Sequence, residues 1–335
     1  MQTGIYIIAE VGQAHDGSLG IAHSYIDALA GTGVNAIKFQ LHIAEAESSS
    51  HEDFRTNFSY LNETRMEYWK RMEFTLRQWS GIKQHCEDKN LDFIATPSSV
   101  AAVDLLYELD VDKYKIGSGD TNNLLLLDRI SKTGKEIIIS SGMSSFDELD
   151  VSVQFLKDRK SKVSLLQCTS AYPTTPRQWG LNVIKEFKSR YKIPVGFSDH
   201  SGTTFACLSA ASRGAEILEF HAVFDKRMFG PDSKSSININ QISGMVKGVR
   251  QIETSLNNPV NKFDNSQFLA YKNIFEKSLS VNKSLQKGHL LSISDLESKK
   301  PGYMGIPASD YERVIGKRLN KDLDQWAFIN YKDFL

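Results

Sequence analysis

Short apolar stretches rich in β-branched residues recur along the first two thirds of the chain, separated by longer segments. Many of these segments carry apolar residues three and four positions apart, the spacing of an amphipathic helix. Examples are residues 21–31, 100–109, 145–158 and 204–215. The eight stretches cover residues 5–12, 35–40, 91–97, 112–120, 136–143, 163–173, 193–201 and 215–225. The pattern predicts strands that alternate with helices.

Continuous apolar strands that alternate with helices are typical of a parallel sheet covered by its helical connections. Eight such units fit a (β/α)8 barrel, the TIM barrel, and a doubly wound open sheet is the alternative. No Gly-x-Gly-x-x-Gly turn follows the first predicted strand, which argues against a dinucleotide-binding open sheet. We therefore predict an α/β protein with a TIM-barrel domain over residues 1–256.

The chain changes character after the predicted barrel. Residues 255–267 are polar and rich in asparagine, with one proline, which is the composition of a linker. We predict a linker over residues 257–277 and a small second domain over residues 278–335. Because a domain of this size buries little surface by itself, we expect it to pack against a larger one.

Composition excludes several classes of partner. The 335 residues include 40 Lys and Arg and 40 Asp and Glu, so no net charge attracts nucleic acid or an anionic membrane. The sequence contains neither a secretory signal nor an apolar run of membrane-spanning length, and we expect a cytoplasmic protein. The three cysteines show no Cys-x-x-Cys spacing, so we expect buried thiols rather than disulfides or a zinc site.

Polar residues stand at or near the end of every predicted strand. In a TIM barrel the carboxyl ends of all strands meet at one face, and active sites of this fold lie there. The sequence therefore predicts a polar site above an apolar interior. The residues are Glu10, Lys38, Gln40, Thr96, Lys115, Ser118, Ser140, Ser141, Ser170, Tyr172, Ser198, Asp199, His200, Glu219 and His221.

Two histidines indicate a metal site. His200 and His221 lie one helix and one strand apart, so we expect them at the ends of neighbouring strands, with Glu10 beside them once the barrel closes. Imidazole and carboxylate groups are common ligands of divalent metals, and Asp199 is a candidate to orient a ligand. The alternative is that each histidine only makes structural hydrogen bonds. We expect the other six histidines at the surface.

Two lysines inside apolar stretches indicate an anion site. Burying Lys38 or Lys115 is costly unless a negative group meets the ammonium. A bound phosphate would satisfy both lysines, and the alternative is that each pairs with an internal carboxylate such as Glu10 or Glu219. Hydroxyl donors stand near the ends of other strands, at Thr96, Ser118, Ser140 and Ser198.

A series of ordered motifs gives the chain a family resemblance. They are IAEVGQAHDG, AIKFQ, ATPSS, YKIGSGD, IISSGM, CTSAYPT, GFSDHSG, Glu219-x-His221 and the GPD of residues 230–232. With them the chain resembles the sialic acid synthases, the N-acetylneuraminate and legionaminate synthases, which condense phosphoenolpyruvate with an N-acetylated amino sugar. The tail, with KSLSVNKSLQKG, KKPGYMGI and VIGKRLNKDL, resembles the antifreeze-like (SAF, β-clip) domain of that family.

The resemblance implies roles for individual residues. It implies a carbon–carbon bond-forming transferase that uses a divalent metal, Mn2+ or else Mg2+ or Co2+, on His200 and His221. It implies that the catalytic residues are Glu10, Lys38, Lys115, His200 and His221. It implies a phosphoenolpyruvate pocket of Lys38, Thr96, Lys115, Ser118, Ser140, Ser170 and Ser198. It implies sugar contacts from Gln40, Tyr172, Asp232 and Lys300, the last from a homodimer with exchanged tails.

The chain departs from the family pattern at five positions. Ala14 stands where an asparagine is usual, Ser98 where a phenylalanine is usual, Asp120 for a glutamate, Phe220 for a lysine and Lys300 for an arginine. Lysine cannot reproduce the planar guanidinium of arginine, so the acceptor sugar stays open. Two other functions also stay open, a metal-dependent barrel lyase or hydrolase of a phosphorylated sugar and a non-catalytic sugar-binding relative.

Overall fold

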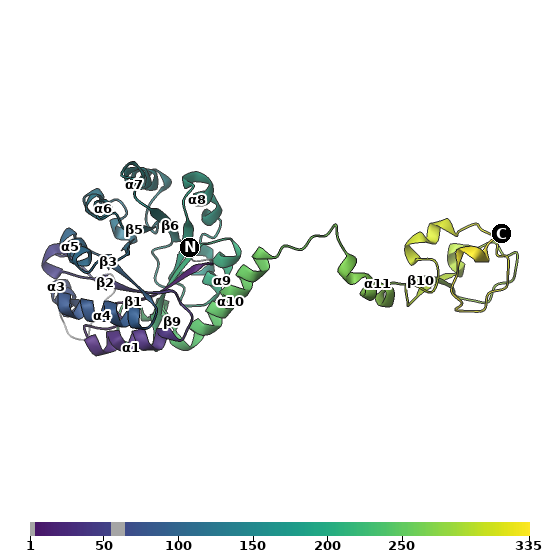
Figure 1. Cartoon of the computed structure of the whole chain (residues 1–335), viewed down its shortest axis with the longest axis horizontal. Helices are drawn as coiled ribbons and strands as arrows, with labels where there is room; N and C mark the ends of the chain where they lie inside the picture. The colour runs from purple at the N-terminus through teal and green to yellow at the C-terminus, as the bar shows by residue number, and fades with distance from the viewer. Residues whose placement is uncertain (1–3, 55–63) are drawn as a thin grey trace. The chain divides into compact units, whose positions relative to one another are not determined.

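A computed structural model describes residues 4–54 and 64–335, and the chain divides into two compact units at Asn258/Pro259 (Figure 1). The strands of the first unit are β1 (Tyr6–Gly12), β2 (Ala36–Leu41), β3 (Asp92–Pro97), β4 (Lys113–Ile116), β5 (Glu136–Ser140), β6 (Val163–Cys168), β7 (Val195–Asp199), β8 (Ile217–Val223) and β9 (Ile237–Asn238). Its helices are α1 (Leu19–Ala30), α2 (Ala44–Glu47), α3 (Arg65–Met72), α4 (Leu76–Asp88), α5 (Val100–Glu108), α6 (Leu124–Ser131), α7 (Phe146–Asp158), α8 (Val183–Tyr191), α9 (Phe205–Ser212) and α10 (Ile239–Asn257).

The strands form a closed parallel barrel. Strands β1 to β8 pair in sequence order, and β1 also pairs with β8, which closes the ring. The helices lie outside this ring in Figure 1, where they cover the strands. The predicted TIM barrel is therefore confirmed, and the open-sheet alternative is excluded by the pairing of β1 with β8.

Local sequence signals account for where several helices begin. At the start of α7, the backbone N–H of Glu148 donates to Oγ of Ser145 at 3.3 Å, and the Glu148 carboxylate accepts from the backbone N–H of Ser145 at 2.7 Å. The same reciprocal pattern starts α3 at Thr64 and α4 at Thr75. Such pairs satisfy N–H groups that a helix end leaves without partners.

The barrel interior is apolar just below the polar ends of the strands. Side chains alternate between the two faces of a strand, so residues two apart point the same way. An interior layer consists of Ile8, Ala36, Ile94, Ile138, Leu166 and Ile217. Two positions further along the same strands stand Glu10, Lys38, Thr96, Ser140, Cys168 and Glu219. The predicted polar site above an apolar interior thus follows because side chains alternate along a strand with a period of two residues.

The expectation that the other six histidines lie at the surface is wrong for His15 and His42. His15 is fully buried, and its ring lies 4.9 Å from the ring of Phe74. His42 is also buried, and its ring stacks on Trp69 at 4.0 Å. Both histidines follow strands, and aromatic side chains from the segment between β2 and β3 cover them. That cover is a long-range contact that a local pattern does not reveal.

The second unit is small and has a core of its own. Its elements are α11 (Leu269–Phe275), β10 (Ser278–Val281) and β11 (Leu296–Lys299), and the two strands pair antiparallel. The core consists of Leu279, Val281, Leu285, Leu291, Ile306, Val314, Leu319, Leu323 and Ile329. Helix α11 lies within the segment predicted as a linker. Across residues 4–54 and 64–335, no helix combines the length and the apolar character needed to cross a membrane.

Two glycine substitutions should test the packing of the barrel. A Cβ added to Gly196 in β7 would lie 2.4 Å from the backbone oxygen of Ile217 and 2.5 Å from Cδ2 of Leu166. Gly196→Ala should therefore destabilise the barrel by about 3 kcal/mol. Gly81→Ala in α4 meets no atom within 4 Å and should stabilise by up to about 1 kcal/mol. Thermal unfolding should show opposite shifts in Tm, and a Gly196→Ala protein as stable as the wild type would contradict this packing.

Candidate active site

The register of the barrel strands brings the predicted site residues into neighbouring rows. Glu10 on β1 is paired with Lys38 on β2 and with His221 on β8, and Ser198 on β7 is paired with Glu219 on β8. Glu10 therefore stands between a lysine and a histidine only because the first and last barrel strands meet. The closure of the barrel therefore brings the residues of the site together.

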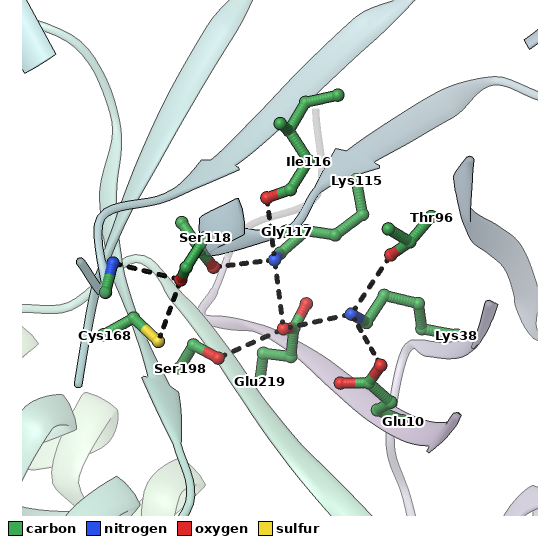
Figure 2. A network of polar contacts seen from close by, with 12 residues as sticks. Glu10, Lys38, Thr96, Lys115, Ile116, Gly117, Ser118, Cys168, Ser198 and Glu219 are labelled. Atoms are coloured by element: carbon green, nitrogen blue, oxygen red, sulfur yellow. Dashed lines mark hydrogen bonds and ion pairs between the residues drawn. The ribbon is translucent and has the colours of Figure 1, made fainter. Parts of the chain in front are cut away.

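Four charged side chains form a buried cluster at this level, which we call the charge cluster: Glu10, Lys38, Lys115 and Glu219 (Figure 2). Nζ of Lys38 lies 2.9 Å from Oε1 of Glu10 and 3.3 Å from Oε1 of Glu219. Nζ of Lys115 also lies 3.3 Å from Oε1 of Glu219. Each of the four residues is at most 3% exposed. The cluster thus combines two basic and two acidic side chains.

Opposite charges within the cluster shift pKa values in both directions. Burial alone would raise the pKa of Glu10, but electrostatic interactions with His221 and Lys38 outweigh burial and lower it. Burial alone would lower the pKa of Lys38, but the two carboxylates raise it. The pKa of Glu219 is lowered by Lys115 and then Lys38, against the effect of burial. Burial lowers the pKa of Lys115 more than the attraction of Glu219 raises it, whereas the ionised forms of Glu10, Lys38 and Glu219 are favoured by mutual attraction.

Hydroxyl groups surround the charge cluster. Nζ of Lys38 donates to Oγ1 of Thr96 at 3.4 Å, and Nζ of Lys115 donates to Oγ of Ser140 at 2.7 Å. Oγ of Ser198 donates to Oε1 of Glu219 at 3.1 Å. Three of the four hydroxyls named from strand ends therefore contact the charge cluster directly.

Two further serines meet close by, at Gly142. The backbone N–H of Gly142 donates to Oγ of Ser118 at 3.0 Å. A Cβ at Gly142 would lie 2.4 Å from Oγ of both Ser118 and Ser170, so this close approach requires glycine. The structure thus gathers the residues predicted to bind phosphoenolpyruvate around one end of the barrel. Because both lysines pair with internal carboxylates, their role toward an anion stays a prediction.

The two histidines lie side by side. Their ring centroids are 5.3 Å apart, both residues are buried, and Nε2 of His221 lies 3.2 Å from Oε2 of Glu10. Burial, with the neighbouring His221, lowers the pKa of His200 to about 4. His200 is therefore a neutral imidazole at neutral pH, which is the form that binds metals.

The donor set at this pair fits a metal ion. Nδ1 of His200 lies 3.2 Å from the backbone oxygen of Thr169, so a proton on Nδ1 leaves Nε2 free as a ligand, an arrangement typical of metal-binding histidines. No cluster of three or more His, Cys, Asp or Glu with metal-binding geometry occurs in residues 4–54 and 64–335. A metal on these imidazoles would take its remaining ligands from water or substrate. Both oxygens of Asp199 accept hydrogen bonds from Ser201 and thereby organise the turn after β7.

A cavity of about 140 Å³ opens beside His221. Its walls are Gln13, Gln40, Arg65, Tyr172, His221, Pro231 and Asp232. Three of the four predicted sugar-binding residues therefore line one cavity. The fourth, Lys300, belongs to the second unit, where its Nζ lies 5.1 Å from the ring centroid of Phe275. Larger cavities of about 520 and 510 Å³ lie at the opposite ends of the strands, where this fold places no catalytic groups.

Three residues at or beside this cavity were not expected from the sequence: Gln13, Arg65 and Tyr68. Arg65 and Tyr68 lie on α3, within the segment that joins β2 to β3. That segment is longer than one helical connection requires, and its extra length was the only sequence signal for them. Conversely, Phe220 points out of the barrel into the core beneath the helices, so this departure from the family pattern does not reach the cavity.

A closed parallel barrel with charged groups and a histidine pair at the carboxyl ends of its strands has the layout of the (β/α)8 enzymes. Comparison with known proteins narrows this class. The model of the NeuB family matches residues 25–261, and that of the SAF domain matches residues 276–330. The chain belongs to the NeuB family, and the resemblance found in its motifs is confirmed.

Several known proteins are similar to this chain over most of its length. It is 31% identical to N,N'-diacetyllegionaminic acid synthase of Campylobacter jejuni, in an alignment that covers 94% of this chain and 96% of that protein. It is also 31% identical to the human N-acetylneuraminate-9-phosphate synthase, with 94% and 88% covered. The crystal structure of N-acetylneuraminic acid synthetase from Leptospira borgpetersenii in complex with citrate matches with a TM-score of 0.71 at 32% identity, over 81% of this chain and 92% of that chain.

Removing one carboxylate should expose the energetic importance of the charge cluster. Glu219→Gln leaves Lys115 buried without its nearest negative charge, and we expect a loss of about 3 to 5 kcal/mol in the free energy of unfolding. A matched control is Glu216→Gln, just before β8, where Glu216 pairs with Lys188 at 2.7 Å in contact with solvent. That change should cost at most about 1 kcal/mol. Urea unfolding of both variants measures the difference, and equal losses would contradict the cluster's role.

Protonation of His15 should couple stability to pH. Burial, with His42 nearby, lowers the pKa of His15 to about 4. The unfolded chain then binds a proton more readily than the native protein between pH 6.5 and 4, so stability falls as the pH falls through this range. His15→Asn should remove on the order of 2 kcal/mol of the loss between pH 7.5 and pH 5. Urea unfolding at the two pH values checks this, with exposed His51→Asn as a control that should keep the wild-type loss.

Proposed function

We propose that this protein is a nonulosonic (sialic-type) acid synthase. It condenses phosphoenolpyruvate with an N-acetylated amino sugar, N-acetylmannosamine or a 2,4-diacetamido-6-deoxy hexose, and releases phosphate. Membership of the NeuB family and relatives named as acid synthases support this class of reaction. One structural observation carries the proposal: His221 borders both the cavity of Gln40, Tyr172 and Asp232 and, through Glu10, the charge cluster.

The lysines and hydroxyls are proposed to bind phosphoenolpyruvate. Its phosphate and carboxylate groups need several donors, and Lys38, Lys115 and the surrounding hydroxyls offer both charge and hydrogen bonds. The carboxylates of Glu10 and Glu219 hold the two ammonium groups in place before the substrate arrives. Donors that need no rearrangement lower the cost of binding and orienting the substrate.

His200 and His221 are proposed to hold a divalent metal, with Mn2+ as the first choice and Mg2+ or Co2+ as alternatives. When bound, such an ion polarises the carbonyl of the acceptor aldehyde. The carbonyl of Thr169 keeps His200 in the tautomer that binds metal, and the carboxylate of Glu10 faces His221. Glu10 is thereby placed to move a proton or to orient water beside the reacting carbonyl.

The chemistry joins the two substrates at C3 of phosphoenolpyruvate. C3 forms a bond to the aldehyde carbon of the open-chain sugar, and water adds at C2. The C2–O bond to phosphate then breaks, and the two protons of the water end on the new hydroxyl and on phosphate. With a hexosamine as acceptor the product is a nine-carbon 2-keto acid. The position of His221 between cavity and charge cluster suits a reaction in which two substrates must touch.

The tail is proposed to complete the site in a homodimer, with the second unit of each chain exchanged onto the partner's barrel so that Lys300 contacts the sugar. The small core of the second unit supports a need for such packing. A cytoplasmic location is part of the same proposal, because the substrates are cytoplasmic metabolites in the family that the motifs resemble.

Phosphate release should test this function directly. We expect the purified protein with Mn2+ to release phosphate from phosphoenolpyruvate only when a suitable acceptor is added, and chelation should abolish release. The acceptors are N-acetylmannosamine, its phosphorylated form and a 2,4-diacetamido-6-deoxy hexose. His200→Ala and His221→Ala should each lower the rate at least about 100-fold. His85→Ala on the outer helix α4 is the control and should keep the wild-type rate.

The outcomes separate the candidate functions. Release without an acceptor would indicate a lyase or hydrolase instead. No release with any acceptor, from a protein that still binds the sugars, would indicate a non-catalytic relative. Near-normal rates in either histidine variant across a Mn2+ titration would contradict the metal site.

A further inference from the structure

A chain of hydrogen bonds runs from α3 to the charge cluster, and we call it the amide chain. Oη of Tyr68 donates to Oε1 of Gln13 at 2.6 Å. Nε2 of Gln13 donates to Oε1 of Gln40 at 3.1 Å, and Nε2 of Gln40 donates to Oε1 of Glu10 at 2.8 Å. Four residues from α3, the loop after β1, β2 and β1 are thus joined in one line.

The hydrogen bonds of the amide chain can run in only one direction. An ionised carboxylate can only accept, so Gln40 must turn its NH2 group toward Glu10 and its carbonyl oxygen toward Gln13. Gln13 must then offer its NH2 group to Gln40, which turns its own oxygen toward Tyr68. The phenol is therefore required as a donor, and burial, followed by the charge of Asp232, raises the pKa of Tyr68 so that it keeps its proton.

Each amide in the amide chain has a second N–H that the amide chain does not use. An NH2 group carries two hydrogens, and the chain uses one from Gln13 and one from Gln40. Both residues line the cavity of about 140 Å³. The same cavity contains Asp232, which accepts hydrogen bonds, and Arg65, which donates them. Because each amide oxygen already accepts a hydrogen bond within the amide chain, we expect the two amides to offer mainly N–H donors to the cavity.

We propose that Tyr68 and Gln13 are positioning residues, which hold the amide of Gln40 in one orientation so that the cavity presents two N–H groups to a carbonyl oxygen of the acceptor sugar. The inference rests on the proposed function and adds residues to that site. Tyr68 also packs against Trp69, at 5.3 Å between ring centroids, and a role in packing alone is the competing explanation. Packing depends on the ring of Tyr68, whereas the amide chain depends on its hydroxyl.

Steady-state kinetics of three variants should separate the two explanations. Tyr68→Phe keeps the ring and should lower kcat/KM for the acceptor about 5- to 10-fold, with KM for phosphoenolpyruvate unchanged. Gln13→Ala should lower it at least as much. Tyr68→Phe added to Gln13→Ala should cause no further loss beyond about twofold, because both changes remove the same hydrogen bond between these two side chains. Multiplied losses in the double variant would overturn the proposal.

Gln13→Glu tests the direction of the chain with almost no change in volume. A carboxylate cannot donate to Oε1 of Gln40, so we expect a loss at least equal to that of Gln13→Ala. Activity within twofold of the wild type would overturn the proposal. Tyr114→Phe is the matched control, because its hydroxyl donates to the backbone oxygen of Val103 on the outside of the barrel.

A second measurement does not depend on activity. In protein labelled with 15N-glutamine, the side-chain signals of Gln13 and Gln40 are assigned by their absence in Gln13→Ala and Gln40→Ala. Tyr68→Phe should shift both signals and Tyr114→Phe neither. A shift of Gln13 alone, or of neither signal, would overturn the amide chain. Both shifts in Tyr68→Phe, together with a wild-type protein that makes no acid, would instead count against the proposed function.

Discussion

The barrel depends on the mutual compensation of four buried charges. Two lysines and two glutamates lie inside the ring, each at most 3% exposed, and the cost of taking even one such ion out of water is several kcal/mol unless an opposite charge meets it. Lys38 and Lys115 both contact Glu219, and Lys38 also contacts Glu10. These contacts join β1, β2, β4 and β8, so the charge cluster is complete only when the barrel is closed.

The balance of positive and negative groups in the charge cluster also affects how an anion would bind. An entering phosphate would find no surplus of positive charge, and it would have to share the ammonium groups of Lys38 and Lys115 with carboxylates already in place. The hydroxyls of Thr96 and Ser140, which those lysines already contact, add hydrogen bonds without adding charge. Selectivity at such a site would come from the number and direction of donors more than from net charge. The direction of hydrogen-bond donors matters in the neighbouring cavity as well, where Glu10 sets the direction of the amide chain.

Much of this could be predicted from the sequence, because it follows from local periodicity. The alternation of apolar strands and helices predicted the barrel, and the residues at the strand ends predicted which side chains would gather. The period of two explains why Glu10 and Lys38 point inward two positions above Ile8 and Ala36. The segment between β2 and β3 could not be predicted in the same way, because its residues reach the site through long-range packing. This long-range packing buries His15 under Phe74 and brings Tyr68 into contact with Gln13.

The sequence by itself determined the fold, the family and the identity of the polar residues at the strand ends, since these depend on residue type and spacing along one chain. Only the tertiary structure decided which of those residues meet. The pairing of β1 with β8 placed Glu10 beside His221, and the barrel placed Lys38 and Lys115 against the internal carboxylates of Glu10 and Glu219. Such partners are chosen by distance and burial across strands, which no local pattern records.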